Sequence, residues 1–217
     1  MAAQAAVSTV GPVRANESPP HPLVQPDPRA GVGGVDRVLV LYDVDGVLAP
    51  MGAPPPDLDM LVLDLPQGRF WFDRALLEVV HLLAGTPHGL GSITAGAGAS
   101  VGLPAVECAW LSSWQEDAAL DLGPALGLPR WATHTKEAAR RSHGWEPGLS
   151  WWKEAVVAWY LRRGRWVVWC DDDIDEYGAR RLVEAFPRLR VLCPDRGRGL
   201  DGDALLSTIR EVGSRSG

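Results

Sequence analysis

The feature that most constrains the fold is an apolar run that ends abruptly in two carboxylates and a glycine. The run ends at Tyr42 and is followed by Asp43, Val44, Asp45 and Gly46. A short run of β-branched and aliphatic residues with polar boundaries is typical of a buried parallel strand. Ligands gather at the carboxyl ends of such strands, and residues two apart on a strand lie on the same side. We therefore expect both carboxylates to face one pocket, with Gly46 allowing a sharp turn.

A second apolar run, from Trp166 to Cys170, also ends in acids, namely Asp171, Asp172, Asp173 and Asp175. Two parallel strands side by side would bring these acids next to the first pair and supply oxygen ligands for one divalent cation, most naturally Mg²⁺. The alternative is that the acids open a helix near Ile174, where negative charge is favoured by the helix dipole. The two roles are compatible. An EF-hand calcium loop does not fit, because Gly46 directly follows the second aspartate.

Strand-like and helix-like segments alternate along the rest of the chain, which predicts an α/β fold with a parallel sheet and helices on both faces. A β-hairpin is expected over 61–65 and 69–72, around Pro66-Gln67-Gly68. Further strands are expected at 106–111, 166–170 and 189–193, and helices at 73–83, 115–126, 150–161, 176–186 and 201–212. The length of 217 residues suits one domain, at 36–213, with an irregular Gly-rich insertion at 85–104. The Pro-rich residues 1–35 are expected to be disordered.

The motif Asp-Val-Asp-Gly-Val-Leu after a hydrophobic strand resembles the first signature motif of the haloacid dehalogenase (HAD) superfamily. Most members of that superfamily are magnesium-dependent phosphatases with a Rossmannoid fold and, often, a hairpin flap just after the nucleophile. The resemblance implies that Asp43 attacks phosphorus and that Asp45 protonates the leaving group and later activates water. The acids after Cys170 resemble the fourth motif, so Asp171 and Asp172 would hold Mg²⁺ with Asp43 and the Asp45 carbonyl. Asp175 lies at another spacing that the family uses.

The family also places a hydroxyl residue at the end of an intervening strand, where it contacts the phosphoryl group. Ser112 resembles this residue, because it directly follows the apolar run that ends at Leu111. Capping of the next helix by Ser112 or Ser113 is the alternative. Thr94, within the Gly-rich insertion, is a fallback for the same role.

A basic residue ahead of the last acids completes the family pattern. Lys153 lies in the first turn of an expected amphipathic helix that starts near Ser150. A lysine gains nothing from the dipole at that end, so a carboxylate partner such as Asp43 or Asp171 is expected. Lys136 is the competing candidate, and solvent exposure is the alternative for either lysine.

Three segments extend the resemblance to a small HAD subgroup that includes the phosphatase-like domain of RNA-repair proteins. They are Trp-Leu-Ser-Ser-Trp114, Trp152-Lys153 and Trp169-Cys-Asp-Asp-Asp173. The chain contains 10 tryptophans, most of which we expect in the core.

Composition narrows the function classes further. The net charge of -6 argues weakly against a dedicated nucleic-acid binder, which would normally display a basic face, and does not exclude one. The cysteines, Cys108, Cys170 and Cys193, lie within or beside apolar runs and are expected to be small buried hydrophobes. No run approaches the ~20 apolar residues of a membrane span, and no secretory signal is recognisable, so a cytoplasmic location without membrane association is expected.

The sequence therefore predicts a magnesium-dependent phosphohydrolase that cleaves a phosphate monoester through an aspartyl-phosphate, with Asp43, Asp45, Ser112 and Lys153 as catalytic residues. The substrate would be a phosphorylated small molecule, a nucleotide or a nucleic-acid end, and no obligate protein partner is evident. The alternatives are a catalytically inactive HAD-fold binding module and a phosphotransferase that shares the aspartyl-phosphate.

Overall fold

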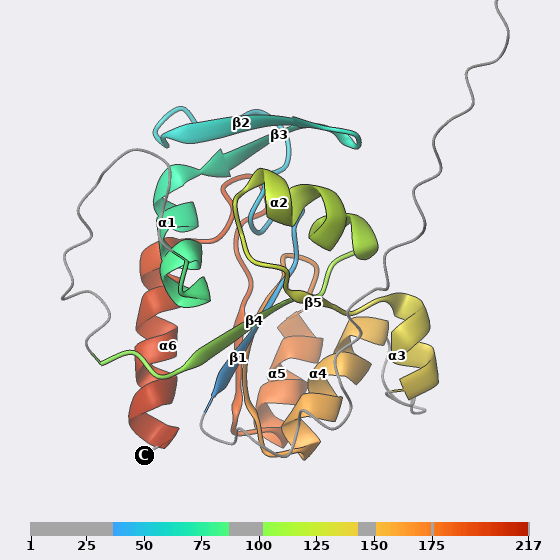
Figure 1. Cartoon of the computed structure of the whole chain (residues 1–217). Helices are drawn as coiled ribbons and strands as arrows, with labels where there is room; N and C mark the ends of the chain where they lie inside the picture. Colours follow the sequence, from blue (N-terminus) through green and yellow to red (C-terminus); the bar gives the residue numbers. More distant parts are fainter. Residues whose placement is uncertain (1–36, 87–101, 143–150, 175, 217) are drawn as a thin grey trace, which may run out of the picture.

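The chain forms an α/β fold around a five-stranded parallel sheet. The structure is a computed structural model that describes residues 37–86, 102–142, 151–174 and 176–216 (Figure 1). The strand order is β5-β4-β1-β6-β7, and each neighbouring pair is parallel. The bounds are β1 Val38–Tyr42, β4 Val106–Trp110, β5 Ala132–Thr133, β6 Trp166–Cys170 and β7 Leu189–Leu192. The predicted α/β class with a parallel sheet is confirmed.

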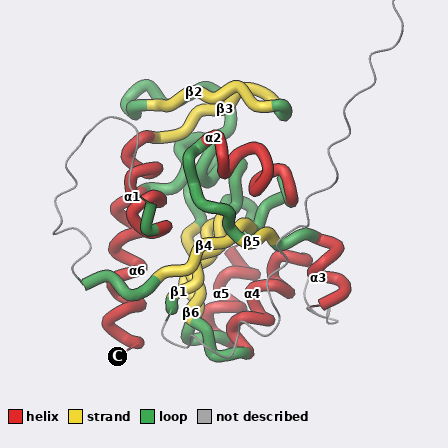
Figure 2. Tube along the Cα trace, viewed as in Figure 1, coloured by secondary structure: helices red, strands yellow, loops and turns green. Residues whose placement is uncertain are grey.

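Helices cover both faces of the sheet, which explains why the strands are continuous apolar runs (Figures 1 and 2). Val38, Val40 and Tyr42 belong to one core cluster, whereas Leu39 and Leu41 belong to the other. The first cluster includes residues of α1 (Arg74–Ala84) and α6 (Gly202–Ser216). The second includes residues of α3 (Lys136–Ser142), α4 (Trp152–Arg162) and α5 (Glu176–Ala185). Every residue of β1 is buried as a result.

The order of the strands places a topological switch point between β1 and β6. From β1 the chain builds one side of the sheet through β4 and β5, and then returns to the other side of β1 for β6 and β7. Tyr42 and Cys170, the last residues of β1 and β6, are partners in register. In open α/β sheets the crevice beyond such a point is where ligands bind.

The predicted hairpin is also present. Strands β2 (Met60–Leu65) and β3 (Gly68–Asp73) pair antiparallel and lie apart from the main sheet, at the top of Figure 1. Asp73 ends the hairpin and accepts a hydrogen bond from the Ala75 backbone N–H, which caps α1. The hairpin is thus fixed at the start of a helix that packs in the first core cluster.

Two of the predicted helices differ in form from the sequence prediction. The helix expected over 115–126 is irregular, with a π-helical turn at Ala118–Leu122 (η2) followed by the short α2 (Gly123–Ala125). Pro124 has no N–H to continue a regular helix, and the Gly123 N–H bonds instead to the Ala118 carbonyl five residues back. Helix α4 was expected to bury one face, but it is buried on nearly all sides because α3 packs on it.

The remaining sequence predictions about the fold have mixed outcomes. The short β5 and the helix α3 were not predicted. Cys108 and Cys170 are buried as expected, but Cys193 is exposed because it lies just beyond the end of β7. The predicted disorder at 1–35 and most of the Gly-rich insertion, residues 87–101, fall outside the described residues. Among the helices that the structure describes, none combines the length and apolar character needed to cross a membrane.

Candidate functional site

The two aspartates that follow β1 and β6 lie side by side at the switch point. The Asp43 N–H donates to the Cys170 carbonyl at 2.9 Å, and the Asp171 N–H donates to the Leu192 carbonyl at 3.1 Å. These bonds extend the sheet ladder by one residue on each strand, so the backbone holds both aspartates rigidly. Asp43 is 5% exposed and Asp171 is fully buried, at 0%.

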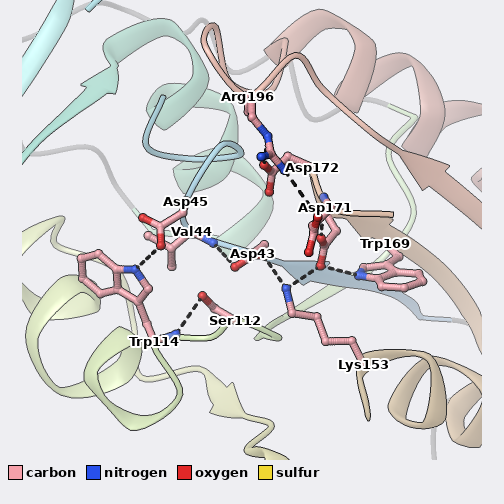
Figure 3. A network of polar contacts seen from close by, with 11 residues as sticks. Asp43, Val44, Asp45, Ser112, Trp114, Lys153, Trp169, Asp171, Asp172 and Arg196 are labelled. Carbon is pink, nitrogen blue, oxygen red and sulfur yellow. Dashed lines mark hydrogen bonds and ion pairs between the residues drawn. The ribbon is translucent and has the colours of Figure 1, made fainter. Parts of the chain in front are cut away.

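Lys153 is the cation that joins these two carboxylates (Figure 3). Its Nζ donates to Oδ2 of Asp43 and, at 2.7 Å, to Oδ2 of Asp171. The Lys153 side chain is only 2% exposed, and its ammonium also lies 4.5 Å from the centre of the Trp151 ring. Lys136, the competing candidate, is exposed on α3. The lysine predicted in the first turn of α4 therefore has the carboxylate partners expected of it.

Asp171 receives further hydrogen bonds that fix its carboxylate. The Trp169 indole N–H donates to Oδ2 at 3.3 Å, and the Asp173 backbone N–H donates to Oδ1 at 3.1 Å. Burial raises the pKa of Asp171 to about 6, and the charge of Asp43 adds to the rise while Lys153 opposes it. One buried ammonium thus does not fully offset the cost of two buried carboxylates.

Asp172 brings a third carboxylate to the same place. Each of Asp43, Asp171 and Asp172 offers one carboxylate oxygen, and these three oxygens lie within 4.8 Å of one another. Burial raises the pKa of Asp172, whereas Arg196, whose Nε lies 3.0 Å from Oδ2, opposes the rise. Three hard oxygen donors with an excess of negative charge suit a divalent cation such as Mg²⁺. The cluster could hold a metal ion.

Gly46 allows the turn after Asp45 to pass against Asp172. Its φ is +70°, a left-handed conformation, and its N–H donates to the Ala49 carbonyl at 2.8 Å. A Cβ added at this position would lie 2.4 Å from Cγ of Asp172. Glycine is therefore needed here for its conformation and for the close approach of the carboxylate.

We expect Gly46→Ala to destabilise the protein more than Gly52→Ala. Both glycines have positive φ, so each alanine carries a backbone strain of about 1–2 kcal/mol. A Cβ at position 52 has nothing within 4 Å, whereas a Cβ at position 46 would have to displace the Asp172 side chain. This overpacking adds about 1–3 kcal/mol to the loss for Gly46→Ala. Urea unfolding of the two variants measures the difference. Equal losses of stability would show that Asp172 does not lie against Gly46.

Asp45 faces a different partner from Asp43. Its carboxyl group is half-buried, and Oδ2 accepts a hydrogen bond from the Trp114 indole N–H at 2.9 Å. Burial raises the pKa of Asp45, the bond from Trp114 opposes that rise, and the charge of Asp43 adds to it. A carboxyl group with a raised pKa suits a proton donor. The two carboxylates share one edge of the sheet, but Asp45 is not part of the three-oxygen cluster.

Ser112 is fully buried beside these acids, at 0% exposure, and Ser113 is exposed. In Figure 3, Ser112 lies below Asp43, between Trp114 and Lys153. Its Oγ accepts the Trp114 backbone N–H at 3.2 Å, which is the local capping contact considered as an alternative role. An accepting hydroxyl keeps its own O–H to donate, so this contact is compatible with a bond to a phosphoryl oxygen. Thr94 and Asp175 lie outside the described residues.

Sequence reasoning did not identify two contacts of this site. One is the bond from Trp114 to Asp45, although the position of this tryptophan just after the candidate serine was a signal. The other is the ion pair between Arg196 and Asp172. Both contacts join residues that are distant in the sequence.

Comparison of the chain with protein-family models, with curated protein sequences and with solved structures gives no significant match.

Proposed function

We propose that this chain is a magnesium-dependent phosphohydrolase of the HAD type, which cleaves phosphate monoesters through an aspartyl-phosphate. The observation that carries the proposal is the buried bridge from Lys153 to Asp43 and Asp171, at the carboxyl ends of two adjacent strands. A carboxylate nucleophile for an anionic substrate needs nearby positive charge to offset the repulsion between them. Lys153 supplies part of that charge at the nucleophile itself.

Asp43, Asp171 and Asp172 are the side chains that would hold the metal, together with the backbone carbonyl of Asp45. Their fit rests on the three carboxylate oxygens within 4.8 Å and on the excess of negative charge around them. When bound, Mg²⁺ would neutralise substrate charge and orient the phosphoryl group. Arg196 would then share Asp172 with the metal.

The residues of the chain divide the chemistry between two steps. In the first step a carboxylate oxygen of Asp43 forms a bond to phosphorus, the ester P–O bond breaks, and Asp45 gives its proton to the departing oxygen. In the second step Asp45 takes a proton from water, whose oxygen attacks phosphorus and releases inorganic phosphate and free Asp43. Ser112 and Lys153 would donate to the phosphoryl oxygens in both steps.

A second part of the proposal concerns the class of phosphate monoester that is cleaved. Arg196 has 55% of its side chain exposed beside Asp172, and it could meet a further anionic group of a substrate. A nucleotide or a nucleic-acid end carries such groups. This reading agrees with the resemblance of the tryptophan-containing motifs to the RNA-repair subgroup.

We expect the purified chain to release inorganic phosphate from 4-nitrophenyl phosphate in Mg²⁺ and to release none in excess EDTA. Released phosphate and the melting temperature are measured under both conditions. If Mg²⁺ raises the melting temperature but no phosphate appears from aryl, nucleotide or oligonucleotide phosphates, the binding-module alternative replaces the phosphatase proposal. Equal turnover in Mg²⁺ and EDTA would contradict the proposed role of the metal.

A further inference from the structure

We propose that Trp114 is a positioning residue that orients the Asp45 carboxyl group for proton transfer to the leaving group. This inference rests on the proposed phosphohydrolase function. The Trp114 indole N–H donates to Oδ2 of Asp45 at 2.9 Å, across 69 positions of sequence. Figure 3 shows the indole and the carboxyl group facing each other on the side of the site opposite Lys153.

The bond distinguishes the two oxygens of Asp45. An indole N–H is a donor only, so the oxygen that it contacts must act as the acceptor. In a neutral carboxyl group the carbonyl-type oxygen is the better acceptor, which leaves the proton on Oδ1. The oxygen that is free of the indole is then the one that delivers a proton.

Trp114 is itself held by contacts with two other parts of the site. Its ring packs edge-on against Phe70 of β3, with centroids 4.8 Å apart and an angle of 65° between the planes. Its backbone N–H donates to Oγ of Ser112 at 3.2 Å. Trp114 therefore joins the hairpin, the candidate phosphate-binding serine and the candidate general acid.

A second contact keeps the hairpin near the segment that carries Trp114. Gln67, in the hairpin turn, donates from Nε2 to Oδ2 of Asp121 in η2 at 2.7 Å. The hairpin and the irregular helix lie next to each other at the top of Figure 1. The orientation of the Asp45 carboxyl group thus depends on the docked hairpin as well as on the indole.

Trp114→Phe separates this role from simple packing. Phenylalanine keeps an aromatic ring against Phe70 but has no N–H for Asp45. If Trp114 only fills space, Trp114→Phe lowers the activity toward all substrates to the same degree. If it orients the proton donor, the loss is concentrated in substrates whose leaving group must be protonated as it departs.

The experiment compares kcat/KM for 4-nitrophenyl phosphate and benzyl phosphate, because kcat/KM includes the departure of the leaving group. For Trp114→Phe we expect a loss of about 10- to 100-fold with benzyl phosphate, a part of the 10²- to 10⁴-fold that a positioned acid contributes. The loss with 4-nitrophenyl phosphate, whose leaving group needs little protonation, should stay below about 3-fold. The matched control is Trp166→Phe, a half-buried tryptophan at the opposite end of β6 from Asp171, which should change both substrates equally.

Melting temperatures establish that the variants are folded. If Trp114→Phe does not fold, Phe70→Leu loosens the ring contact while retaining the indole, and it should show the same substrate-selective loss. Equal losses with both substrates in the folded variant overturn the positioning role and leave the proposed function intact. A wild-type chain that releases no phosphate from either substrate overturns the proposed function, and this inference with it.

Discussion

Asp43→Asn is expected to abolish phosphatase activity, with a fall in kcat of at least about 10,000-fold, because the amide cannot form the acyl-phosphate. The same change should not unfold the protein. It removes one of three clustered carboxylates, and the charge of Asp43 is one of the causes that raise the pKa of Asp171. We therefore expect an unchanged or higher melting temperature. Phosphate release and thermal unfolding of the same preparation measure both effects.

The matched control for this change is Asp173→Asn. Asp173 lies beside the cluster, but its side chain is 70% exposed, and its Oδ1 lies 3.5 Å from a guanidinium nitrogen of Arg196. Its substitution should alter activity by less than about 3-fold, as for most surface positions. Retention of more than a tenth of the activity in folded Asp43→Asn would show that another group is the nucleophile.

The main strands could be predicted from the sequence because each is a continuous apolar run with polar boundaries. β6 was expected at 166–170 and lies at Trp166–Cys170, β1 ends at Tyr42 as the apolar run does, and β4 ends one residue earlier than expected. β5 has only two residues, so it carries no periodic signal. The burial of α4 on nearly all sides was not predictable either, because α3, which packs on it, was itself missed.

The acidic residues of the site were also foreseeable, because acids at the ends of two parallel neighbouring strands must lie close together. The orientation of each side chain was not. Asp43 and Asp45 are two residues apart, yet one pairs with Lys153 and the other with Trp114. Strand periodicity ends with β1 at Tyr42, so the turn at Gly46 and the packing of Trp114 decide where Asp45 points.

Lys153→Met should cause the largest loss of stability among single changes at this site, about 3–5 kcal/mol near pH 8. Removing one partner of a buried ion pair leaves the charge of the other partner uncompensated. Here one ammonium pairs with both Asp43 and Asp171, and the side chains of Lys153 and Asp171 are only 2% and 0% exposed. Lys153 opposes the rise in the pKa of Asp171, which is about 6 in the wild type, so its removal raises that pKa further.

The sign of the pH dependence follows from this shift. In Lys153→Met, the folded-state pKa of Asp171 lies further above the unfolded-chain value of about 3.9 than it does in the wild type. The variant is therefore most stable below a pH of about 3.9, and it loses stability as the pH rises through the folded-state pKa. The deficit relative to wild type should therefore grow from pH 5 to pH 8.

The chain offers one matched control, because Lys136 is its only other lysine and is exposed. Lys136→Met should change the free energy of unfolding by less than about 0.5 kcal/mol at any pH in this range. Urea unfolding at pH 5 and pH 8 measures both variants. Added Mg²⁺ should restore part of the stability of Lys153→Met, since a divalent cation can neutralise the same carboxylates. A deficit that is independent of pH would mean that Lys153 contributes through packing of its side chain and not through its charge.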